Sequence, residues 1–386
     1  MKKTSSNKII RGVTVSQSVG FFSGLIAPLR ELGFEVASVS SDGPELESVR
    51  KAGGRVHIVE MERHISTFKD IKSLFKLIKL FKKEKPLLVH SMTPKAGLLC
   101  MIAAKLAGVP FRIHTFTGLV FPTSTGLKRK LLMATDALTC DCATHIIPEG
   151  EGVKADLLNN GITHKPINVL GHGNCKGIDL EWFNPGNPEI QKIATKIRKN
   201  DIFTFIFIGR IVRDKGINEL AEAFNRLYLE RKDIRLILVG AYEDDLDPIS
   251  PLARNIIAYC EGIEAVGQQM DVRPWLAASD AFVFPSYREG FPNVVIEAGA
   301  MNLPSIVTDI NGSREIIIDG ENGVIIPSKN TDALYSAMKG FVENKERTDK
   351  MAKASRPLVA SRYEAGYVRQ CLLDFYNEIL SAHPIH

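Results

Sequence analysis

Short apolar runs alternate with amphipathic segments along the first half of the chain. Runs of strand length occupy residues 9–15, 35–39, 56–59, 87–90, 113–116 and 144–149. Helical periodicity fills most of the gaps between them, at about 25–32, 44–52, 68–84, 94–107 and 150–160. This alternation predicts βαβ units, and therefore a parallel sheet with helices on both faces. We expect residues 166–170 to add a last strand and residues 16–24 to form a small-residue loop after the first one.

Apolar runs continue in the second half. We expect strands at 203–208, 236–240, 264–267, 281–284, 305–308 and 324–327. Residues 186–200 are polar with helical character and are a plausible crossing between domains, and residues 331–386 are expected to be helical. A chain of 386 residues is long enough for two or three domains, each with its own core.

The stretch FPSYREGFPNVVIEAGAMNLP, residues 284–304, combines a strand end, a turn and a helix start. The turn passes through Glu289 and Gly290, and Pro292 suits the first helical position because its missing N–H would have no partner there. The amides of Phe291, Asn293 and Val294 are then expected to point out of the helix start. Such amides form a binding site for an anion such as phosphate.

Two carboxylates flank this helix start. Glu289 precedes it, and Glu297 lies five residues beyond Pro292, about 7 Å along the axis. Together they are placed to hold hydroxyl groups on either side of a bound phosphate. A nucleotide sugar offers ribose, diphosphate and hexose in that order.

Composition and charge narrow the class of protein. Hydrophobic residues make up 45% and charged residues 24%, which excludes a disordered chain. The formal charge of +5 favours an anionic ligand or membrane surface, and no basic block with interleaved aromatic residues predicts nucleic-acid binding. The six cysteines are scattered without zinc-ligand spacing, and we expect them to be reduced in an intracellular protein. No apolar run reaches membrane-spanning length, and Arg11 interrupts the apolar run near the N-terminus, so we expect no signal peptide.

Two basic amphipathic segments carry a further possibility. Residues 68–85 place Ile71, Leu74, Phe75, Ile78 and Phe81 on one face and lysines elsewhere, and residues 127–133 combine a basic cluster with helical apolar periodicity. One interpretation is a pair of helices that cover the sheet. The other is an interfacial surface that attracts anionic lipid headgroups, so that the protein contacts the membrane peripherally.

The acidic run that contains Asp244, Asp245 and Asp247 is interpreted as a solvated turn, because no partners at ligand spacing support a metal site. His114 is interpreted as a core or sheet histidine. No Gly-x-Gly-x-x-Gly follows the first strand, which argues against a nicotinamide-dependent oxidoreductase.

The stretch PSYREGFPNVVIEA with its two glutamates, followed by PSIVTD and Asn311-Gly312, resembles the signature of retaining glycosyltransferases of family 4. Residues 209–216, GRIVRDKG, resemble the donor-diphosphate loop of that family, with Arg210 and Lys215 carrying the match; the alternative is two solvated surface cations. Residues 171–185 resemble the hinge of members that assemble capsule, O-antigen and other glycan repeats on a polyprenol carrier.

The resemblance implies an α/β protein with the GT-B fold, in which two Rossmann-like domains with parallel sheets face a central cleft. Residues 1–185 would form the acceptor-side domain and residues 186–364 the nucleotide-sugar domain, with the last helix, about 365–386, returning to the first. It implies retaining transfer of a hexose or N-acetylhexosamine from a UDP-sugar to a lipid-linked or oligosaccharide acceptor, without metal or cofactor. The expected location is the cytoplasm, at the inner face of the membrane.

The resemblance also assigns roles. Arg210 and Lys215 would stabilise the departing diphosphate, Glu289 would bind sugar hydroxyls and orient the donor, and Glu297 would hold the ribose. Gly20, in the loop after the first strand, would lie over the diphosphate and the acceptor, although a plain strand-to-helix turn explains it equally well. The implied donor-binding set is Gly20, Arg210, Lys215, Glu289, Phe291, Pro292, Asn293, Val294 and Glu297.

The sequence departs from the family at one point. Many members place a histidine directly before the glycine that is Gly118 here, but this chain has Thr117. This departure keeps one alternative open, a non-catalytic sugar-nucleotide-binding protein. A second alternative is another enzyme class on the same architecture, an isomerase resembling UDP-N-acetylhexosamine 2-epimerase.

Overall fold

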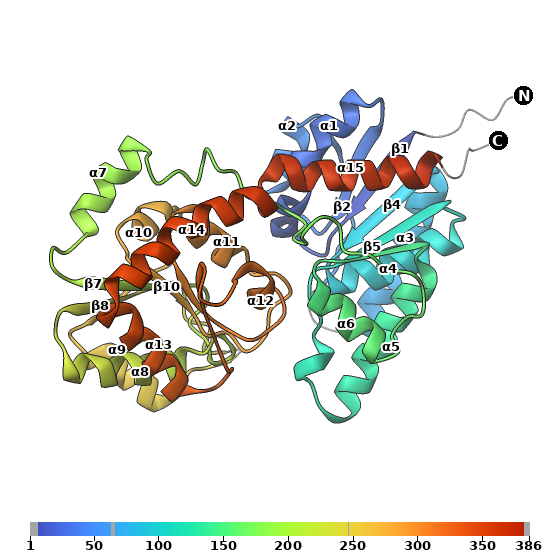
Figure 1. Cartoon of the computed structure of the whole chain (residues 1–386). Coiled ribbons are helices and arrows are strands. Elements are labelled where there is room, and N and C mark those ends of the chain that lie inside the picture. The colour runs from blue at the N-terminus through green and yellow to red at the C-terminus, as the bar shows by residue number, and fades with distance from the viewer. Residues whose placement is uncertain (1–6, 63–65, 246, 382–386) are drawn as a thin grey trace, which may run out of the picture. The chain divides into compact units, whose positions relative to one another are not determined.

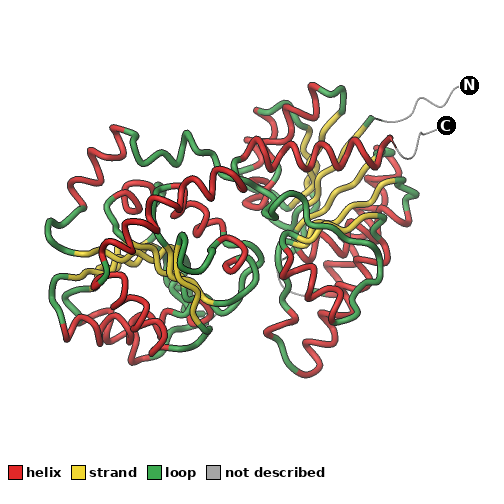
Figure 2. The backbone as a smooth tube through the Cα atoms, viewed as in Figure 1, coloured by secondary structure: helices red, strands yellow, loops and turns green. Residues whose placement is uncertain are grey.

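The computed structural model describes residues 7–62, 66–245 and 247–381, so the first six residues of the basic start lie outside it (Figure 1). The described chain divides into two compact units. Unit 1 comprises Met1–Gly177 and Gly366–His386, and unit 2 comprises Ile178–Ala365. In Figure 2 each unit has a layer of strands with helices around it.

The described part of unit 1 contains a six-stranded parallel sheet in the order β3-β2-β1-β4-β5-β6. Its strands are β1 (Lys8–Gly12), β2 (Glu35–Ser40), β3 (Arg55–Ile58), β4 (Leu88–Met92), β5 (Phe111–Phe116) and β6 (His145–Pro148). In the central strand, Ile9 pairs with Val36 on one side and Leu88 on the other. The expected parallel sheet is confirmed.

Helices cover both faces of this sheet because successive strand residues point to opposite sides. Ile9 belongs to a core closed by α1, α2 and α15, whereas Ile10 belongs to a core closed by α3, α4, α5 and α6. The helices are α1 (Ile26–Glu31), α2 (Leu46–Lys51), α3 (Thr67–Glu84), α4 (Pro94–Leu106), α5 (Gly126–Cys142), α6 (Glu151–Asn159) and α15 (Ala365–Ser381).

Two expectations for this unit are wrong. Residues 166–170 form no strand, and the sheet ends at β6; Ile167, 5% exposed, instead packs into the core from an irregular segment. Residues 16–24 are mostly not an open loop, because Ser16–Phe21 and Ser23–Leu25 form 3-10 helices whose Val19 and Leu25 are buried. The small residues of this segment predicted a loop, but the burial of its apolar side chains gives it helical structure.

Unit 2 repeats the architecture with a second parallel sheet, six strands in the described residues, ordered β12-β11-β10-β7-β8-β9. Its strands are β7 (Phe203–Ile208), β8 (Ile234–Val239), β9 (Ile263–Gly267), β10 (Ala281–Phe284), β11 (Ser305–Thr308) and β12 (Gly323–Ile326). Its helices are α7 (Pro188–Ile197), α8 (Ile217–Glu230), α9 (Pro251–Tyr259), α10 (Arg273–Ala277), α11 (Asn293–Ala300), α12 (Ser313–Ile316), α13 (Thr331–Glu343) and α14 (Lys345–Tyr363). The bounds expected for β7, β10 and β11 are confirmed to the residue.

Candidate functional site

Four loops of unit 2 follow the carboxyl ends of neighbouring strands. Residues 209–216 follow β7, residues 240–247 follow β8, residues 285–292 follow β10 and residues 309–312 follow β11. Ligands of open α/β sheets bind at this edge. The two sequence stretches that predicted donor binding therefore meet there, because β7 and β10 are hydrogen-bonded neighbours.

The loop after β7 lies directly against the loop after β10. Arg213–Lys215 forms a 3-10 turn that ends at Gly216, with φ 73°. A Cβ at Gly216 would lie 2.1 Å from the carbonyl oxygen of Pro285, so only glycine permits this approach. The Tyr287 amide then donates to the Asp214 carbonyl at 2.8 Å.

Lys215 and Glu289, predicted from separate motifs, form an ion pair. Their side chains are only 15% and 16% exposed. The Lys215 ammonium also lies 5.3 Å from the centre of the Phe284 ring, and the Ser286 hydroxyl donates to Glu289 Oε1 at 2.8 Å. The cation is thus fixed at the strand edge rather than solvated.

Arg210 lies on the same loop and remains 46% exposed, with Nη1 donating to Glu243 at 2.8 Å. Burial opposes its charge, but the carboxylates of Glu243, Asp214 and Glu289 outweigh burial and raise the pKa of Arg210. Arg210 therefore lies within electrostatic reach of Glu289.

The helix start differs from the expectation by one residue. Pro292 has ψ 100°, so it is the N-cap and α11 begins at Asn293. The expectation that the Phe291 amide belongs to the helix start is wrong, since that residue precedes the cap. Asn293 and Val294 are thus the first two residues of the helix, and the Val295 amide donates to the Pro292 carbonyl at 3.1 Å.

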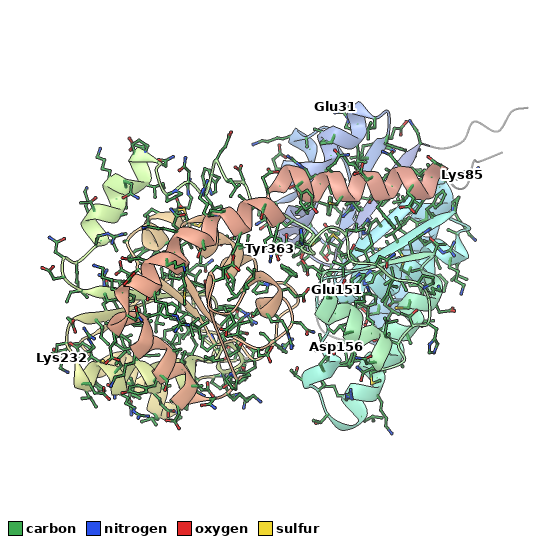
Figure 3. The ribbon with its side chains drawn as sticks, in the orientation of Figure 1. Glu31, Lys85, Glu151, Asp156, Lys232 and Tyr363 are labelled. Carbon is green, nitrogen blue, oxygen red and sulfur yellow. The ribbon has the colours of Figure 1, made fainter. Side chains whose placement is uncertain are left out.

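The side chain of Phe291 anchors this turn. It is 5% exposed and packs edge-on against Tyr363, labelled in Figure 3, with 5.5 Å between ring centres. On the other side, a Cβ at Gly312 would lie 2.5 Å from the Gly290 carbonyl. Phe291 is therefore a packing residue of the site, whereas Asn293 and Glu297, four residues apart, lie on one partly exposed face of α11.

Three residues that order the site were not found by sequence reasoning. Ser286 is fully buried, Glu243 pairs with Arg210, and Asp247 accepts from the Asp214 amide at 2.7 Å and pairs with Arg213 at 3.0 Å. Interpreting Asp247 as part of a solvated turn is wrong, because its carboxylate holds the cationic loop in place. Ser286 could have been found from its position inside the stretch 284–304, whereas no feature of the sequence points to Glu243.

In unit 1, Gly20 lies in the 3-10 helix after β1 and is exposed. A Cβ there would meet nothing within 4 Å, so no protein contact requires glycine. His114 is a core histidine as expected: it is 1% exposed, its Nδ1 bonds to Ser91 at 2.9 Å, and burial lowers its pKa to about 3. Thr117, at the position of the family histidine, is partly exposed.

Within the described ranges, no group of three or more histidine, cysteine or acidic residues is arranged to hold a metal ion. Among the same residues, no helix is both long and apolar enough to cross a bilayer. The unit 2 site itself offers two cations, a helix start and two carboxylates, which is a set suited to an anionic, hydroxyl-bearing ligand.

Comparison with known proteins gives an independent result. Residues 202–344 match the family model described as "Glycosyl transferases group 1", and residues 21–173 match "Glycosyl transferase 4-like domain". The chain is 33% identical over 376 residues to the capsular polysaccharide biosynthesis glycosyltransferase CapM of Staphylococcus aureus, covering 97% of this chain and 98% of the relative. It is 31% identical to an Escherichia coli UDP-Gal:alpha-D-GlcNAc-diphosphoundecaprenol alpha-1,3-galactosyltransferase, covering 73% of each.

Solved structures agree on the fold. The crystal structure of the Anabaena protein HepE in complex with UDP is similar with a TM-score of 0.79 at 16% identity, covering 96% of this chain and 99% of that one. The expected fold class, GT-B with two parallel-sheet units, is thereby confirmed.

Proposed function

The chain belongs to the group 1 glycosyltransferases, and from this premise we propose that it builds a bacterial surface polysaccharide such as a capsule or O-antigen. In the proposed reaction, a hexose or N-acetylhexosamine moves from a UDP-sugar to a sugar carried on polyprenol diphosphate. The transfer retains the anomeric configuration and uses no metal. The names of the S. aureus and E. coli relatives support the capsule, the UDP donor and the lipid-linked acceptor.

The observation that carries the proposal is the ion pair between Lys215 and Glu289 at the carboxyl ends of β7 and β10. An incoming diphosphate would compete with Glu289 for the ammonium. The released carboxylate could then accept hydrogen bonds from hydroxyls of the donor sugar. One pair would thus bind the leaving group and position the sugar.

The remaining residues complete the donor site. Arg210 offers a two-pronged donor group to the diphosphate, and the amides of Asn293 and Val294 add hydrogen bonds to it. Glu297, on the same face of α11 as Asn293, holds the ribose hydroxyls. Fixed cations stabilise the charge that grows on the departing diphosphate, and that phosphate helps to deprotonate the acceptor on the same face of the sugar.

A lipid-linked acceptor requires contact with a membrane, and unit 1 has a surface suited to it. Phe68 and Phe75 on α3 are 91% and 66% exposed, and Leu127 on α5 is 83% exposed. Exposed lysines accompany them on both helices. We therefore place the enzyme at the cytoplasmic face of the membrane, held peripherally by these two helices.

The test begins with calorimetry using a panel of nucleotides and nucleotide sugars, which identifies the donor. Turnover is then measured with a polyprenyl-diphosphate-linked sugar, and the product linkage is assigned by NMR. The variant Arg210→Ala should lower kcat about 10²- to 10³-fold, as removal of one charge-stabilising donor does elsewhere. Its fold should be intact, because a half-exposed ion pair contributes only about 0–1 kcal/mol.

Arg254→Ala is a matched control. Arg254 is 47% exposed and pairs with Asp244 in the loop that also supplies the partner of Arg210. Its loss should leave kcat within about twofold, since surface substitutions away from a site are usually near neutral. A wild-type rate in Arg210→Ala would refute the assignment, and a new sugar formed from the donor without acceptor would identify an isomerase instead.

A further inference from the structure

Unit 1 contains a cavity of about 550 Å³ that shares no residue with the unit 2 site. It lies among α3, α4, α5 and the segments that follow β1, β4 and β5. Cavities that hold small organic ligands measure about 300–1,000 Å³. This one is therefore large enough for a substantial part of a ligand.

One wall of the cavity is aliphatic, whereas hydroxyl and charged side chains line the rest. Leu98 and Leu99 contribute from α4, and Leu131 and Leu132 from α5. None of the residues that line it within the described chain is aromatic. At the strand edge, the hydroxyls of Thr14 and Thr93 lie 2.8 Å apart and bond to one another. The leucines of the two helices thus offer an apolar chain a wall to pack against, and the two threonine hydroxyls are already bonded to one another.

The charges in the cavity nearly cancel. Lys95 lies 2.8 and 3.0 Å from the two oxygens of Asp70, and both side chains are largely buried. Burial raises the pKa of Asp136 to about 7, so this carboxyl is about half protonated at neutral pH and largely neutral below it. A phosphate would find no surplus positive charge here, whereas an uncharged hydrocarbon would pay no electrostatic penalty.

The exposed apolar residues of unit 1 occur on the helices that form the cavity. Phe68 and Ile71 lie within two residues of Asp70 on α3, and Leu131 both lines the cavity and is 48% exposed. Both α3 and α5 pack against α4, which lies between them. The exposed apolar residues of α3 and α5 therefore border the cavity.

We propose that this cavity holds the first isoprene units of the lipid-linked acceptor, which enter between α3 and α5 from the membrane. The assignment of the occupant as an isoprenoid rests on the proposed function. The cavity would hold the isoprene units next to the diphosphate of the lipid. The acceptor sugar would then be presented by a lipid that unit 1 holds in place. Recognition of the acceptor would then depend on its lipid as well as on its sugar.

Leu131→Glu is the direct test, because it places a charge at the mouth of the cavity. Leu138→Glu is its matched control: Leu138 lies two turns along α5, is 45% exposed against 48% for Leu131, and does not line the cavity. Thr135→Trp fills the cavity without adding charge. The probe is farnesyl diphosphate, titrated calorimetrically into the full-length protein and compared with inorganic pyrophosphate and dodecyl phosphate.

We expect Leu131→Glu and Thr135→Trp each to weaken farnesyl diphosphate binding about tenfold or more, and Leu138→Glu to change it less than about twofold. Both cavity variants should raise KM for a polyprenyl-linked acceptor by a similar factor while UDP binding stays unchanged. Pyrophosphate binding as tightly as farnesyl diphosphate would overturn the proposal, as would equally tight binding of dodecyl phosphate. So would unchanged farnesyl diphosphate binding in both cavity variants.

The two proposals fail in different ways. In one outcome, the protein binds no nucleotide sugar but still binds farnesyl diphosphate in a way that depends on Leu131. This outcome would refute the proposed function but keep the cavity as an isoprenoid site. Unchanged KM for the lipid acceptor in an active Leu131→Glu enzyme would refute the cavity assignment and leave the proposed function standing.

Discussion

Single buried side chains order the proposed donor site of unit 2. Ser286 is fully buried, and its hydroxyl lies 2.8 Å from Glu289 Oε1 and 3.2–3.3 Å from the carbonyls of Arg288 and Asp214. A hydroxyl has one proton to donate, and the nearest and charged acceptor is Glu289. Ser286 therefore restrains the carboxylate that pairs with Lys215.

Asp136 leads to a prediction of pH-dependent stability. Burial raises its pKa from 3.8 to about 7, so the folded state holds a proton that the unfolded state releases. The stability that the protonated Asp136 carboxyl contributes to the fold is fully present below about pH 4 and is lost as the pH rises through about 7. Relative to wild type, the free energy of unfolding of Asp136→Asn should rise by up to roughly 1.4 kcal/mol per pH unit across this window and then level off. Urea denaturation at pH 5, 7 and 8.5 measures this difference.

Asp141→Asn, on the same helix, is the control. The hydrogen bond from Lys105 lowers the pKa of Asp141, so its charged form stabilises the fold above its unfolded pKa. Asp141→Asn should therefore gain no stability relative to wild type as the pH rises. A gain of equal size in both variants would show that the effect is not due to the burial of Asp136.

Helix α3 divides its apolar residues between two surfaces. Leu77 and Phe81 are buried in the core, whereas Phe68, Ile71 and Phe75 remain exposed. The sequence placed Ile71, Phe75 and Phe81 on one face, but the sheet covers only the side centred on Leu77. The exposed residues, together with the lysines of α3, form the surface that we expect to contact lipid.

Vesicle binding tests this surface. Replacing both Phe68 and Phe75 by serine should lower partitioning onto vesicles with anionic lipid by roughly tenfold, because two large apolar side chains no longer enter the interface. Binding of the wild type should weaken as salt is raised, since the lysines act through screened charge. Co-sedimentation measures both effects.

Tyr259→Ser serves as the control for vesicle binding, because Tyr259 is 84% exposed on α9 of unit 2. It should leave partitioning unchanged. If the double variant partitions like wild type, or if Tyr259→Ser loses as much binding, α3 is not the membrane contact.

At the scale of the whole molecule, the chain ends by returning to unit 1. Tyr376 of α15 is 1% exposed, accepts from Arg11 at 2.7 Å and bonds to His90 Nδ1 at 2.6 Å. Arg11 is itself 1% exposed on the central strand. The last helix therefore supplies a partner that a buried charge needs.

Tyr376→Phe should consequently destabilise unit 1 by about 1–3 kcal/mol, the cost of leaving a buried donor without its partner. Hydrogen exchange should show lost protection in β1 and β4, with β7 and β10 unchanged. Tyr367→Phe, on the same helix but 39% exposed, should cost less than about 0.5 kcal/mol. Equal loss of protection in both units would contradict the division of the chain into separately stabilised units.

Local pattern was enough to predict much of this molecule. The bounds of β7, β10 and β11 follow from apolar runs that are buried on both faces, and such runs are recognisable without knowledge of their neighbours. The resemblance to family 4 predicted that the Lys215 and Glu289 motifs belong to one site, and the two side chains are in contact. The catalytic roles of these residues remain predictions.

Only the tertiary structure decided which groups face one another. Asp247 supports the cationic loop through a contact between distant segments. The side of α3 that stays exposed is likewise set by what packs against that helix. The cavity of unit 1 is the clearest case, because its walls come from residues as far apart as Thr14 and Asp136. Periodicity shows which side of a helix or strand is apolar. Whether another element covers that side, and which one, depends on how the whole chain packs.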